Sequence, residues 1–512
     1  MQVKAQKREA PSPWKADICL LLEGTYPYVG GGVSSWVHQI IRGMPELTFG
    51  IVFLGGSREL YGKMKYELPS NVTHLETHYL TDAWQKGVPR PRPGNAPAFA
   101  DVQTLHEAFR TPEKGVPDDV FRRVMASFGV EHGIPRSDFL YSEEAWNRIC
   151  TDYRRFCTDP SFVDYFWTVR TMHAPLFMLA DIARKLPQFR VYHTVSTGYA
   201  GFLAAMLHGL TGRPVILSEH GIYTKERKID LAQAEWIKDA RETFGAGLED
   251  SAGYIRGMWI RFFEGIGRVT YHASNPIVGL YEGVRQRQVK DGAALDRTKI
   301  VPNGIDLPRF AALREKRPAG VPKVLGLLGR VVPIKDIRTF IRACRTVVAR
   351  IPEAEGWIIG PDDEDKEYAR ECHELVSSLG LEGKVKFLGF QKPDDILPKL
   401  GLMVLTSISE ALPLVILEGY ASGLPCVSTD VGSCRELIEG IREDDRAIGA
   451  SGFVVPIASP ELTAQAAISL LGDEDRWRAA QAAGIARVER YYTQPLMFGA
   501  YRQIYQDALA KA

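Results

Sequence analysis

The sequence predicts an α/β protein of two Rossmann-like, doubly wound domains, with a helical insertion in the first. Short runs of Val, Ile and Leu alternate with helical patterns in both halves of the chain, and a Pro-containing stretch at 306–322 separates the two sets. Such runs are typical of parallel strands buried on both faces. At 512 residues the chain is also too long for one ordinary core, so two domains are expected.

In the first half of the chain, the alternation of strand and helix patterns is interrupted once. A loop with Gly30, Gly31 and Gly32 follows the first strand and leads into a helix from about Ser34 to Gly43. From about residue 81 to 189 the alternation gives way to charged and aromatic residues with helical spacing, which predicts a large helical insertion. The expected strands are 17–22, 49–54, 71–75, 190–193, 214–219, 269–272 and 299–301.

The second half repeats the strand–helix rhythm and ends in an amphipathic helix at 496–509. We therefore expect a first domain at 1–310, a second at 311–490, and a C-terminal helical segment at 491–512 that packs back on the first domain. Doubly wound sheets bind ligands at the carboxyl ends of their strands, so we expect a cleft there. The strands of this half are 323–328, 356–360, 385–387, 403–405, 426–429 and 453–456.

Composition narrows the range of functions. The 63 basic and 62 acidic residues nearly cancel, which argues against nucleic acid as a partner. No window approaches the roughly 18 apolar residues of a membrane helix, and the seven cysteines are scattered without C-x-x-C spacing. We expect a cytoplasmic protein without structural zinc or any other metal cofactor, recruited to the inner membrane only through partners.

The strongest chemical signal is a pair of carboxylates, Glu410 and Glu418. Pro413 fits the first turn of a helix and Gly423 its C-terminal cap, so Glu410 lies just before the helix and Glu418 about five residues into it. Two carboxylates on the order of 8 Å apart along a helix axis can accept hydrogen bonds from two parts of one extended ligand. The alternative is that Glu410 only complements the helix dipole and Glu418 is solvated.

A second signal is cationic. Arg330 follows an apolar strand directly, and Lys335 lies five residues later in the same strand-to-helix loop. An arginine fork and a compact lysine charge suit a diphosphate, whereas the alternative is a solvated loop with two cations.

Glycine-containing turns form the third and fourth signals. Gly432 and Ser433 follow the strand at 426–429, and Ser433 with Glu436 has the spacing of a capping box, so a helix end with free amides is expected there. The Gly30–Gly32 turn lets backbone approach a ligand closely, although its spacing is not that of a dinucleotide site.

Histidines give the fifth signal. His193, His220 and His272 each fall at the carboxyl end of an expected strand. Zinc is disfavoured because the three sit on separate strands without paired spacing, and His220, beside Glu219 and Gly221, is the best candidate for a functional role.

Taken together, these motifs resemble the retaining GT-B glycosyltransferases of family 4. The resemblance rests on the Gly30–Gly32 turn, the segment Val301-Pro302-Asn303-Gly304-Ile305-Asp306, Gly329-Arg330 with Lys335, and Glu410 with Glu418, in this order. Within the family, residues 20–38, the large insertion and Ser218-Glu219-His220-Gly221-Ile222-Tyr223 are similar to the PelF-type enzymes, which act in synthesis of the biofilm exopolysaccharide Pel.

The resemblance implies a role for each candidate. Arg330 and Lys335 would hold the donor diphosphate, Glu418 the ribose hydroxyls and Glu410 the sugar hydroxyls, while His220 would face the reacting sugar. Ala411 departs from the glycine that many family members carry, and Pro413 lacks an amide to donate. The remaining donor contacts would come from backbone at Gly30, Gly31, Gly32, Leu412, Leu414, Val415, Gly432 and Ser433.

The implied reaction is retaining transfer from a UDP-sugar, either UDP-glucose or a UDP-N-acetylhexosamine, to a saccharide acceptor. Inner-membrane subunits of a polysaccharide synthase complex would be the protein partners. A nucleotide-sugar epimerase or a phosphorylase on the same fold is an alternative enzyme, and a nucleotide-binding scaffold for membrane subunits is a non-catalytic alternative.

Overall fold

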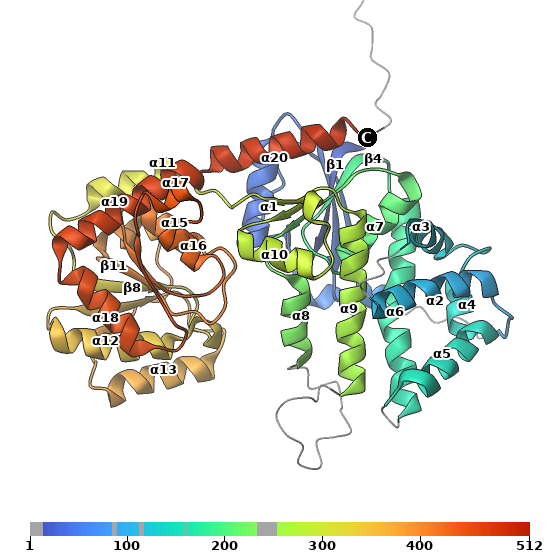
Figure 1. The fold of residues 1–512 in the computed structure, drawn as a ribbon, viewed down its shortest axis with the longest axis horizontal. Helices are drawn as coiled ribbons and strands as arrows, with labels where there is room; N and C mark the ends of the chain where they lie inside the picture. Colours follow the sequence, from blue (N-terminus) through green and yellow to red (C-terminus); the bar gives the residue numbers. More distant parts are fainter. Residues whose placement is uncertain (1–13, 84–89, 112–116, 159–160, 233–252) are drawn as a thin grey trace, which may run out of the picture. The chain divides into compact units, whose positions relative to one another are not determined.

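A computed structural model describes residues 14–83, 90–111, 117–158, 161–232 and 253–512 (Figure 1). The chain forms two compact units. The N-terminal unit comprises Met1–Gly279, Arg285–Lys299 and Tyr501–Ala512, and the C-terminal unit comprises Leu280–Val284 and Ile300–Ala500. The boundary expected at residue 310 therefore lies inside the C-terminal unit.

A seven-stranded sheet forms the centre of the N-terminal unit. Its strands are β1 (Ala16–Glu23), β2 (Phe49–Gly55), β3 (Val72–Tyr79), β4 (Phe189–Thr194), β5 (Val215–Glu219), β6 (Ile277–Gly279) and β7 (Thr298–Ile300), in the order β3-β2-β1-β4-β5-β6-β7. The pairs from β3 through β6 run parallel. Every residue of β2 is buried, as expected of a strand covered on both faces.

Helices connect these strands. They are α1 (Gly32–Gly43), α7 (Tyr199–Thr211), α8 (Tyr223–Ala232), α9 (Tyr254–Ala273) and α10 (Glu282–Lys290). The prediction of a strand at 269–272 is wrong, because these residues form the last turn of α9. The strand of this region is β6, which follows the Asn275-Pro276 step.

The segment between β3 and β4 is helical. It contains α2 (Ala96–Arg110), α3 (Asp118–Ser127), α4 (Arg136–Tyr141), α5 (Glu143–Phe156) and α6 (Phe162–Lys185). Residues 84–89, 112–116 and 159–160 of the expected insertion lie outside the described residues. Figure 1 shows α2, α4, α5 and α6 gathered at the right of the N-terminal unit. Their apolar side chains join one hydrophobic core with those of α7 and α9.

A six-stranded parallel sheet forms the centre of the C-terminal unit. Its strands are β8 (Val324–Leu328), β9 (Glu355–Ile359), β10 (Val385–Phe387), β11 (Leu402–Leu405), β12 (Cys426–Thr429) and β13 (Gly452–Val455), in the order β10-β9-β8-β11-β12-β13. All six strands expected here from the sequence are present within one residue at either end.

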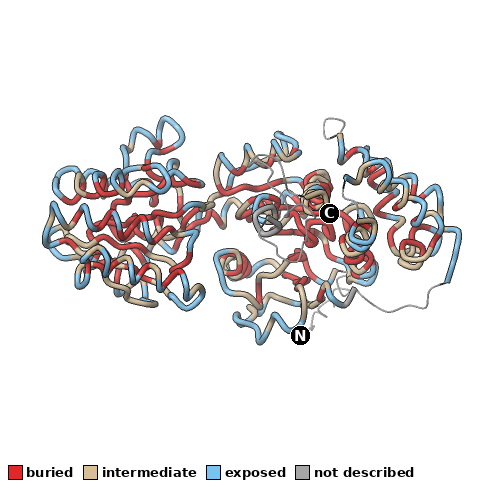
Figure 2. The backbone as a smooth tube through the Cα atoms, turned by 90° about the horizontal axis from the view of Figure 1, so that it is seen from below, coloured by how far each residue is buried: buried red, intermediate tan, exposed pale blue. Residues whose placement is uncertain are grey.

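Ten helices of the described chain belong wholly or partly to this unit after residue 300. They are α11 (Leu307–Ala311), α12 (Ile337–Arg350), α13 (Lys366–Ser378), α14 (Pro393–Ile396), α15 (Leu414–Ala421), α16 (Cys434–Glu439), α17 (Glu443–Arg446), α18 (Pro460–Leu471), α19 (Glu474–Tyr491) and α20 (Gln494–Leu509). In each unit, the buried residues concentrate in the interior around the sheet (Figure 2).

The end of α20 belongs to the N-terminal unit. Tyr505 shares a 2.8 Å hydrogen bond with His193 Nδ1, and the Tyr501 hydroxyl donates to Ser218 Oγ at 2.9 Å. Both tyrosines are completely buried. The last turns of α20 are therefore part of the N-terminal unit's core.

The prediction of a two-domain α/β fold with Rossmann-like parallel sheets is confirmed. In each sheet the strand order reverses at one point, between β1 and β4 and between β8 and β11. Ligands of doubly wound sheets bind at the carboxyl ends of strands beside such a point. Within the described ranges, no helix is both long and apolar enough to span a membrane.

Candidate functional site

The loops after β8 and β11 carry the central charges of the C-terminal unit. Lys335 Nζ lies 2.5 Å from Glu410 Oε1, and the two side chains are 19% and 15% exposed. Ser407 Oγ donates to the same carboxylate oxygen at 2.7 Å. The pair is thus fixed at the switch point of this sheet, largely shielded from solvent.

The loop geometry explains why Lys335 reaches Glu410. The lysine side chain passes over Gly329, where an added Cβ would lie 3.3 Å from Lys335 Cε. Thr406 Oγ1 donates to the backbone carbonyl oxygen of Lys335 at 2.9 Å and so ties the β8 loop to the end of β11. The family resemblance implies that Lys335 binds the diphosphate and Glu410 the sugar hydroxyls, and the structure brings these two side chains together.

Arg330 is held differently. Its guanidinium contacts both oxygens of Glu364 at 2.5 and 2.6 Å, and the two side chains are 55% and 51% exposed. The two cations, both implied by the resemblance to hold the diphosphate, are therefore paired with different carboxylates, and of the two only Lys335 is largely buried. An exposed pair contributes little stability, so Arg330 can exchange Glu364 for an anionic ligand at low cost.

Helix α15 supplies the second carboxylate and free amides. Its N-cap is Pro413, which offers no side-chain hydrogen bond, so the amides of Leu414 and Val415 at its start have no capping side chain. Leu412, just before it, is buried in the hydrophobic core. Glu418 is the fifth residue of the helix, as predicted from the sequence.

Glu418 is in an environment that disfavours charge. Burial raises the pKa of its carboxyl to about 7, partly offset by the nearby Arg309. Arg309 in turn forms a bidentate ion pair with Asp394, with Nε 3.1 Å from Oδ1 and Nη2 2.5 Å from Oδ2. A carboxyl of this kind is suited to hydrogen bonding with neutral hydroxyl groups.

Gly432 and Ser433 contact the backbone of the loop that carries Glu410. Gly432 has φ +55°, and a Cβ there would lie 2.3 Å from Glu410 O and 2.4 Å from Ala411 O. The Ser433 amide donates to Ala411 O at 2.9 Å. These two residues thus hold the backbone that carries Glu410.

The expected capping box at this point is wrong. Helix α16 does begin after Ser433, but the serine side chain makes no capping bond, and its Oγ is buried without a partner in the described part of the chain. Glu436 instead accepts from the Glu282 amide at 3.4 Å. Helix α16 has six residues, two fewer than α15.

In the N-terminal unit, the Gly30–Gly32 turn is exposed. A Cβ on Gly31 or Gly32 would meet no atom of the described residues within 4 Å, so packing against these residues does not require glycine at the two positions. The turn opens α1, whose first turn has no acidic residue and no side-chain cap. This arrangement leaves backbone amides open to a ligand, as the sequence predicts.

His220 follows β5 and packs edge-to-face against Trp36, with ring centroids 4.5 Å apart. Burial lowers the pKa of its imidazole to about 4, so the ring is neutral at pH 7. Its Nε2 is buried and has no hydrogen-bond partner among the residues that the structure describes. An orphaned ring nitrogen in a neutral histidine is available to a ligand.

The other two histidines are accounted for by structure. His193 is bonded through Nδ1 to Tyr505 and through Nε2 to Ser218 Oγ. His272 lies in α9 rather than at a strand end, and its Nε2 is 2.8 Å from Asp118. Of the three, only His220 remains a candidate for contact with a ligand.

Sequence reasoning missed Glu23, the last residue of β1. Its carboxylate accepts from the Tyr223 hydroxyl at 3.0 Å, the Ala200 amide at 3.2 Å and Ser196 Oγ at 3.4 Å. These partners bring together the loops that follow three strands. The sequence offered one signal for Glu23, since an acidic residue follows the apolar run at 18–22 directly. In the structure this residue ends β1, one of the two strands at which the strand order of the sheet reverses.

Glu219, beside His220, is the centre of a buried network of hydrogen bonds with Tyr271 and Gln288. It accepts from Tyr271 at 2.8 Å and from Gln288 at 3.1 Å, and burial raises its pKa from 4.5 to about 7. The folded protein keeps this proton between those pH values while the unfolded chain releases it. Stability should therefore fall as pH rises from about 4.5 to 7.

We expect Glu219→Gln to flatten this pH dependence by on the order of 3 kcal/mol, because glutamine keeps the acceptor oxygen but cannot ionise. Denaturant unfolding at pH 5, 6, 7 and 8 measures the effect. The exposed Glu461→Gln is the matched control and should retain the wild-type slope. An unchanged slope in Glu219→Gln would show that other groups set the pH dependence.

Comparison with known proteins adds to this geometry. Residues 16–296 match the family described as a domain of unknown function (DUF3492), and residues 322–473 match the family described as glycosyl transferases group 1. The first match covers more than half of the chain.

Curated glycosyltransferases match part of the chain. A D-inositol 3-phosphate glycosyltransferase of Nocardia farcinica is 30% identical over 41% of this chain and 48% of its own length. The lipopolysaccharide core biosynthesis glycosyltransferase LpsE of Rhizobium meliloti is 35% identical over 29% of this chain and 42% of its own length. The chain thus spans less than half the length of each of these relatives.

Solved structures share the fold along nearly the whole chain. Anabaena HepE, solved with UDP and glucose, has a TM-score of 0.57 at 14% identity, covering 96% of this chain and 99% of its own. Sucrose-phosphate synthase from Thermosynechococcus elongatus has a TM-score of 0.56 at 16% identity, covering 97% of this chain and all of its own. The chain belongs to the DUF3492 family, and residues 322–473 of its C-terminal unit match glycosyl transferases group 1.

Proposed function

We propose that this protein is a retaining glycosyltransferase that moves a sugar from a UDP-sugar to a growing polysaccharide of the Pel exopolysaccharide type. The observation that carries the proposal is the shielded Lys335–Glu410 pair at the switch point of a group 1 glycosyltransferase domain. UDP accompanies glucose in the structure of HepE, which has the same fold. The enzyme acts in the cytoplasm, recruited by inner-membrane subunits of a synthase complex.

The C-terminal unit would hold the donor. In this proposal Lys335, with Arg330 released from Glu364, neutralises the diphosphate, and the amides at the start of α15 add hydrogen bonds. Glu418 accepts hydrogen bonds from the ribose hydroxyls, and Glu410 from the sugar hydroxyls. The contacts of Gly432 and Ser433 with the backbone of Glu410 and Ala411 keep Glu410 in place before the substrate arrives.

The reaction would need no covalent contribution from the protein. The acceptor hydroxyl oxygen attacks the anomeric carbon from the side of the leaving group, the bond from that carbon to the phosphate oxygen breaks, and UDP leaves with the hydroxyl proton. We assign the saccharide acceptor to the N-terminal unit and contact with the reacting sugar to neutral His220. No metal ion is required, because the two cations already oppose the diphosphate charge.

The deciding experiment combines binding with transfer. UDP should raise the Tm of the full chain more than GDP or ADP does, since a ligand at 100 times its Kd stabilises by about 2.7 kcal/mol. Incubation with UDP-glucose or UDP-N-acetylhexosamine and an oligosaccharide acceptor should yield an extended saccharide, with or without EDTA. Formation of an epimerised sugar nucleotide, a phosphate-dependent product, or no product at all would contradict the proposal.

Two glutamate variants separate the parts of the donor. Glu418→Ala should weaken binding of both UDP and the UDP-sugar, by about tenfold or more for the loss of hydrogen bonds to the ribose. Glu410→Ala should leave UDP affinity within a few fold and reduce turnover instead. Calorimetric titration of both variants with UDP measures the difference, and equal losses would show that the roles are misassigned.

A further inference from the structure

A cavity that the proposed reaction does not use lies between the helical insertion and α9. It has a volume of about 240 Å³ and lies among α2, α5, α6 and α9 of the N-terminal unit. Most of its wall is apolar, with side chains such as Phe99, Ile149, Leu176 and Met258. A cavity of roughly 150 Å³ with such a lining binds benzene, so this one has room for about ten carbon atoms.

The charged groups of the wall carry an excess of positive charge. Arg110, Arg148 and Arg261 line the cavity against Asp152 and Glu264. Burial lowers the pKa values of the two histidines in the wall, to about 3 for His106, so both imidazoles are neutral at pH 7. The charged lining therefore has three cations and two anions.

Two of the three arginines, Arg110 and Arg148, are not fully satisfied by the anions present. Arg110 and Asp152 are 4.0 Å apart at their closest nitrogen and oxygen, at the outer limit of an ion pair. Arg148 donates to Gln103, while its Nε is buried without a partner within the described ranges. The same burial that shields these groups raises the pKa of Asp152 and so disfavours its charge. An anion would satisfy donors that the protein leaves open.

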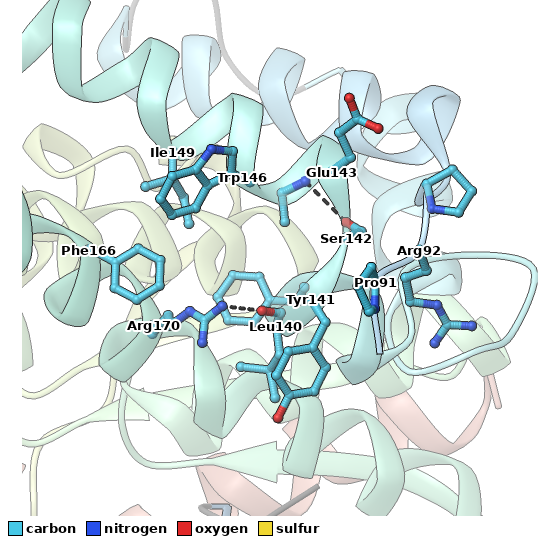
Figure 3. A pocket seen from close by; sticks show the side chains of 13 residues that line it. Pro91, Arg92, Leu140, Tyr141, Ser142, Glu143, Trp146, Ile149, Phe166 and Arg170 are labelled. Carbon is cyan, nitrogen blue, oxygen red and sulfur yellow. Dashed lines mark hydrogen bonds between the residues drawn. The ribbon is translucent and has the colours of Figure 1, made fainter. Parts of the chain in front are cut away.

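A surface groove reaches the same wall from outside (Figure 3). Its volume is about 570 Å³, and it shares Phe139, Ala145 and Ile149 with the cavity. Figure 3 shows Trp146 and Phe166 on the same side of the groove as Ile149. The groove and the cavity therefore meet at these three side chains.

We propose that this cavity is a binding site for an anionic amphiphile, with an apolar chain of about ten carbons among α2, α5, α6 and α9 and an anionic head at Arg110 and Arg148. The apolar wall provides the driving force for the chain, and the open arginine donors select the sign of the head group. None of the residues assigned to the glycosyltransferase reaction lines this cavity, so the two proposals can fail independently.

Calorimetric titration of the full-length protein tests the proposal with three ligands of one chain length. Decanoate should bind saturably at one site, decanol more weakly, and decylamine weakest of all. Arg148→Met should lower decanoate affinity by about tenfold while changing decanol affinity little, because charge-assisted hydrogen bonds are lost and the chain contacts remain. The matched control is Arg154→Met, which removes an exposed arginine from the same helix and should bind as wild type does.

A cavity-filling variant locates the chain. Val169→Phe places extra carbon atoms in the cavity from α6 and should abolish binding of both decanoate and decanol. Far-ultraviolet circular dichroism and the Tm of each variant show that it is folded. The proposal is overturned if wild type shows no saturable decanoate binding, if decylamine binds as tightly as decanoate, or if a folded Val169→Phe binds decanoate normally.

Discussion

Lys335→Ala is expected to lower the initial rate of sugar transfer by on the order of 100-fold to 1000-fold at saturating acceptor. The lysine is the largely buried cation at the switch point of the C-terminal sheet, and its removal takes away a fixed positive charge where the leaving diphosphate gains negative charge. It also leaves Glu410 without its ion-pair partner. Donor binding and turnover should both suffer, because the remaining carboxylate repels the diphosphate.

The matched control is Lys386→Ala in the same unit. Lys386 also pairs with a glutamate, at 2.7 Å from Glu355, but on β10, which is the edge strand of the sheet farthest from β11. Its loss should change the rate by a few fold at most. If Lys335→Ala and Lys386→Ala retain similar rates, Lys335 has no role in stabilising the diphosphate. Arg330→Ala should fall between the two, since Arg330 must first leave Glu364.

Gly432→Ala is expected to destabilise the C-terminal unit by about 3 kcal/mol or more and to abolish detectable UDP binding. The new Cβ would overlap the carbonyl oxygens of Glu410 and Ala411, which are backbone atoms and cannot rotate away. The clash can be relieved only by moving the loop that carries Glu410. Denaturant unfolding and UDP titration measure the two losses.

Gly380→Ala separates this clash from simple backbone strain. Gly380 has φ +64°, close to the value at Gly432, but a Cβ there would meet no atom within 4 Å in the part of the chain that the structure describes. Alanine at this position should cost about 1 kcal/mol and leave UDP binding intact. Equal effects of the two substitutions would mean that the left-handed backbone alone, and not contact with the Glu410 loop, explains the need for glycine at 432.

The sheet strands of the C-terminal unit were predictable because each is a short apolar run between helices. The same reasoning failed at 269–272, since Val-Thr-Tyr-His has β-branched and aromatic residues yet ends the 20-residue helix α9. Periodicity cannot distinguish a short buried strand from the buried end of a helix. The true strand, β6, has only three residues and gave no pattern of its own.

The residue types of the candidate site could be predicted from the sequence, but the contacts between their side chains could not. Spacing placed Glu410 before α15 and Glu418 within it, since both depend on one local helix start. The pairing of Lys335 with Glu410 spans 75 positions and depends on the order of β8 and β11 in the sheet. Likewise, Glu436 satisfies the S-x-x-E pattern but accepts from the Glu282 amide, because tertiary contact overrides the local signal.

The position of Tyr501 and Tyr505 in the N-terminal core has a consequence for biosynthesis. The first strand of this sheet is formed by residues 16–23, but the buried side chains of Tyr501 and Tyr505 are missing until residue 505 has been translated. His193 and Ser218 would meanwhile be short of a hydrogen-bond partner that arrives some 300 residues later. Part of the core of the N-terminal unit is therefore missing until residue 505 has been translated, by which point the whole C-terminal unit has been made.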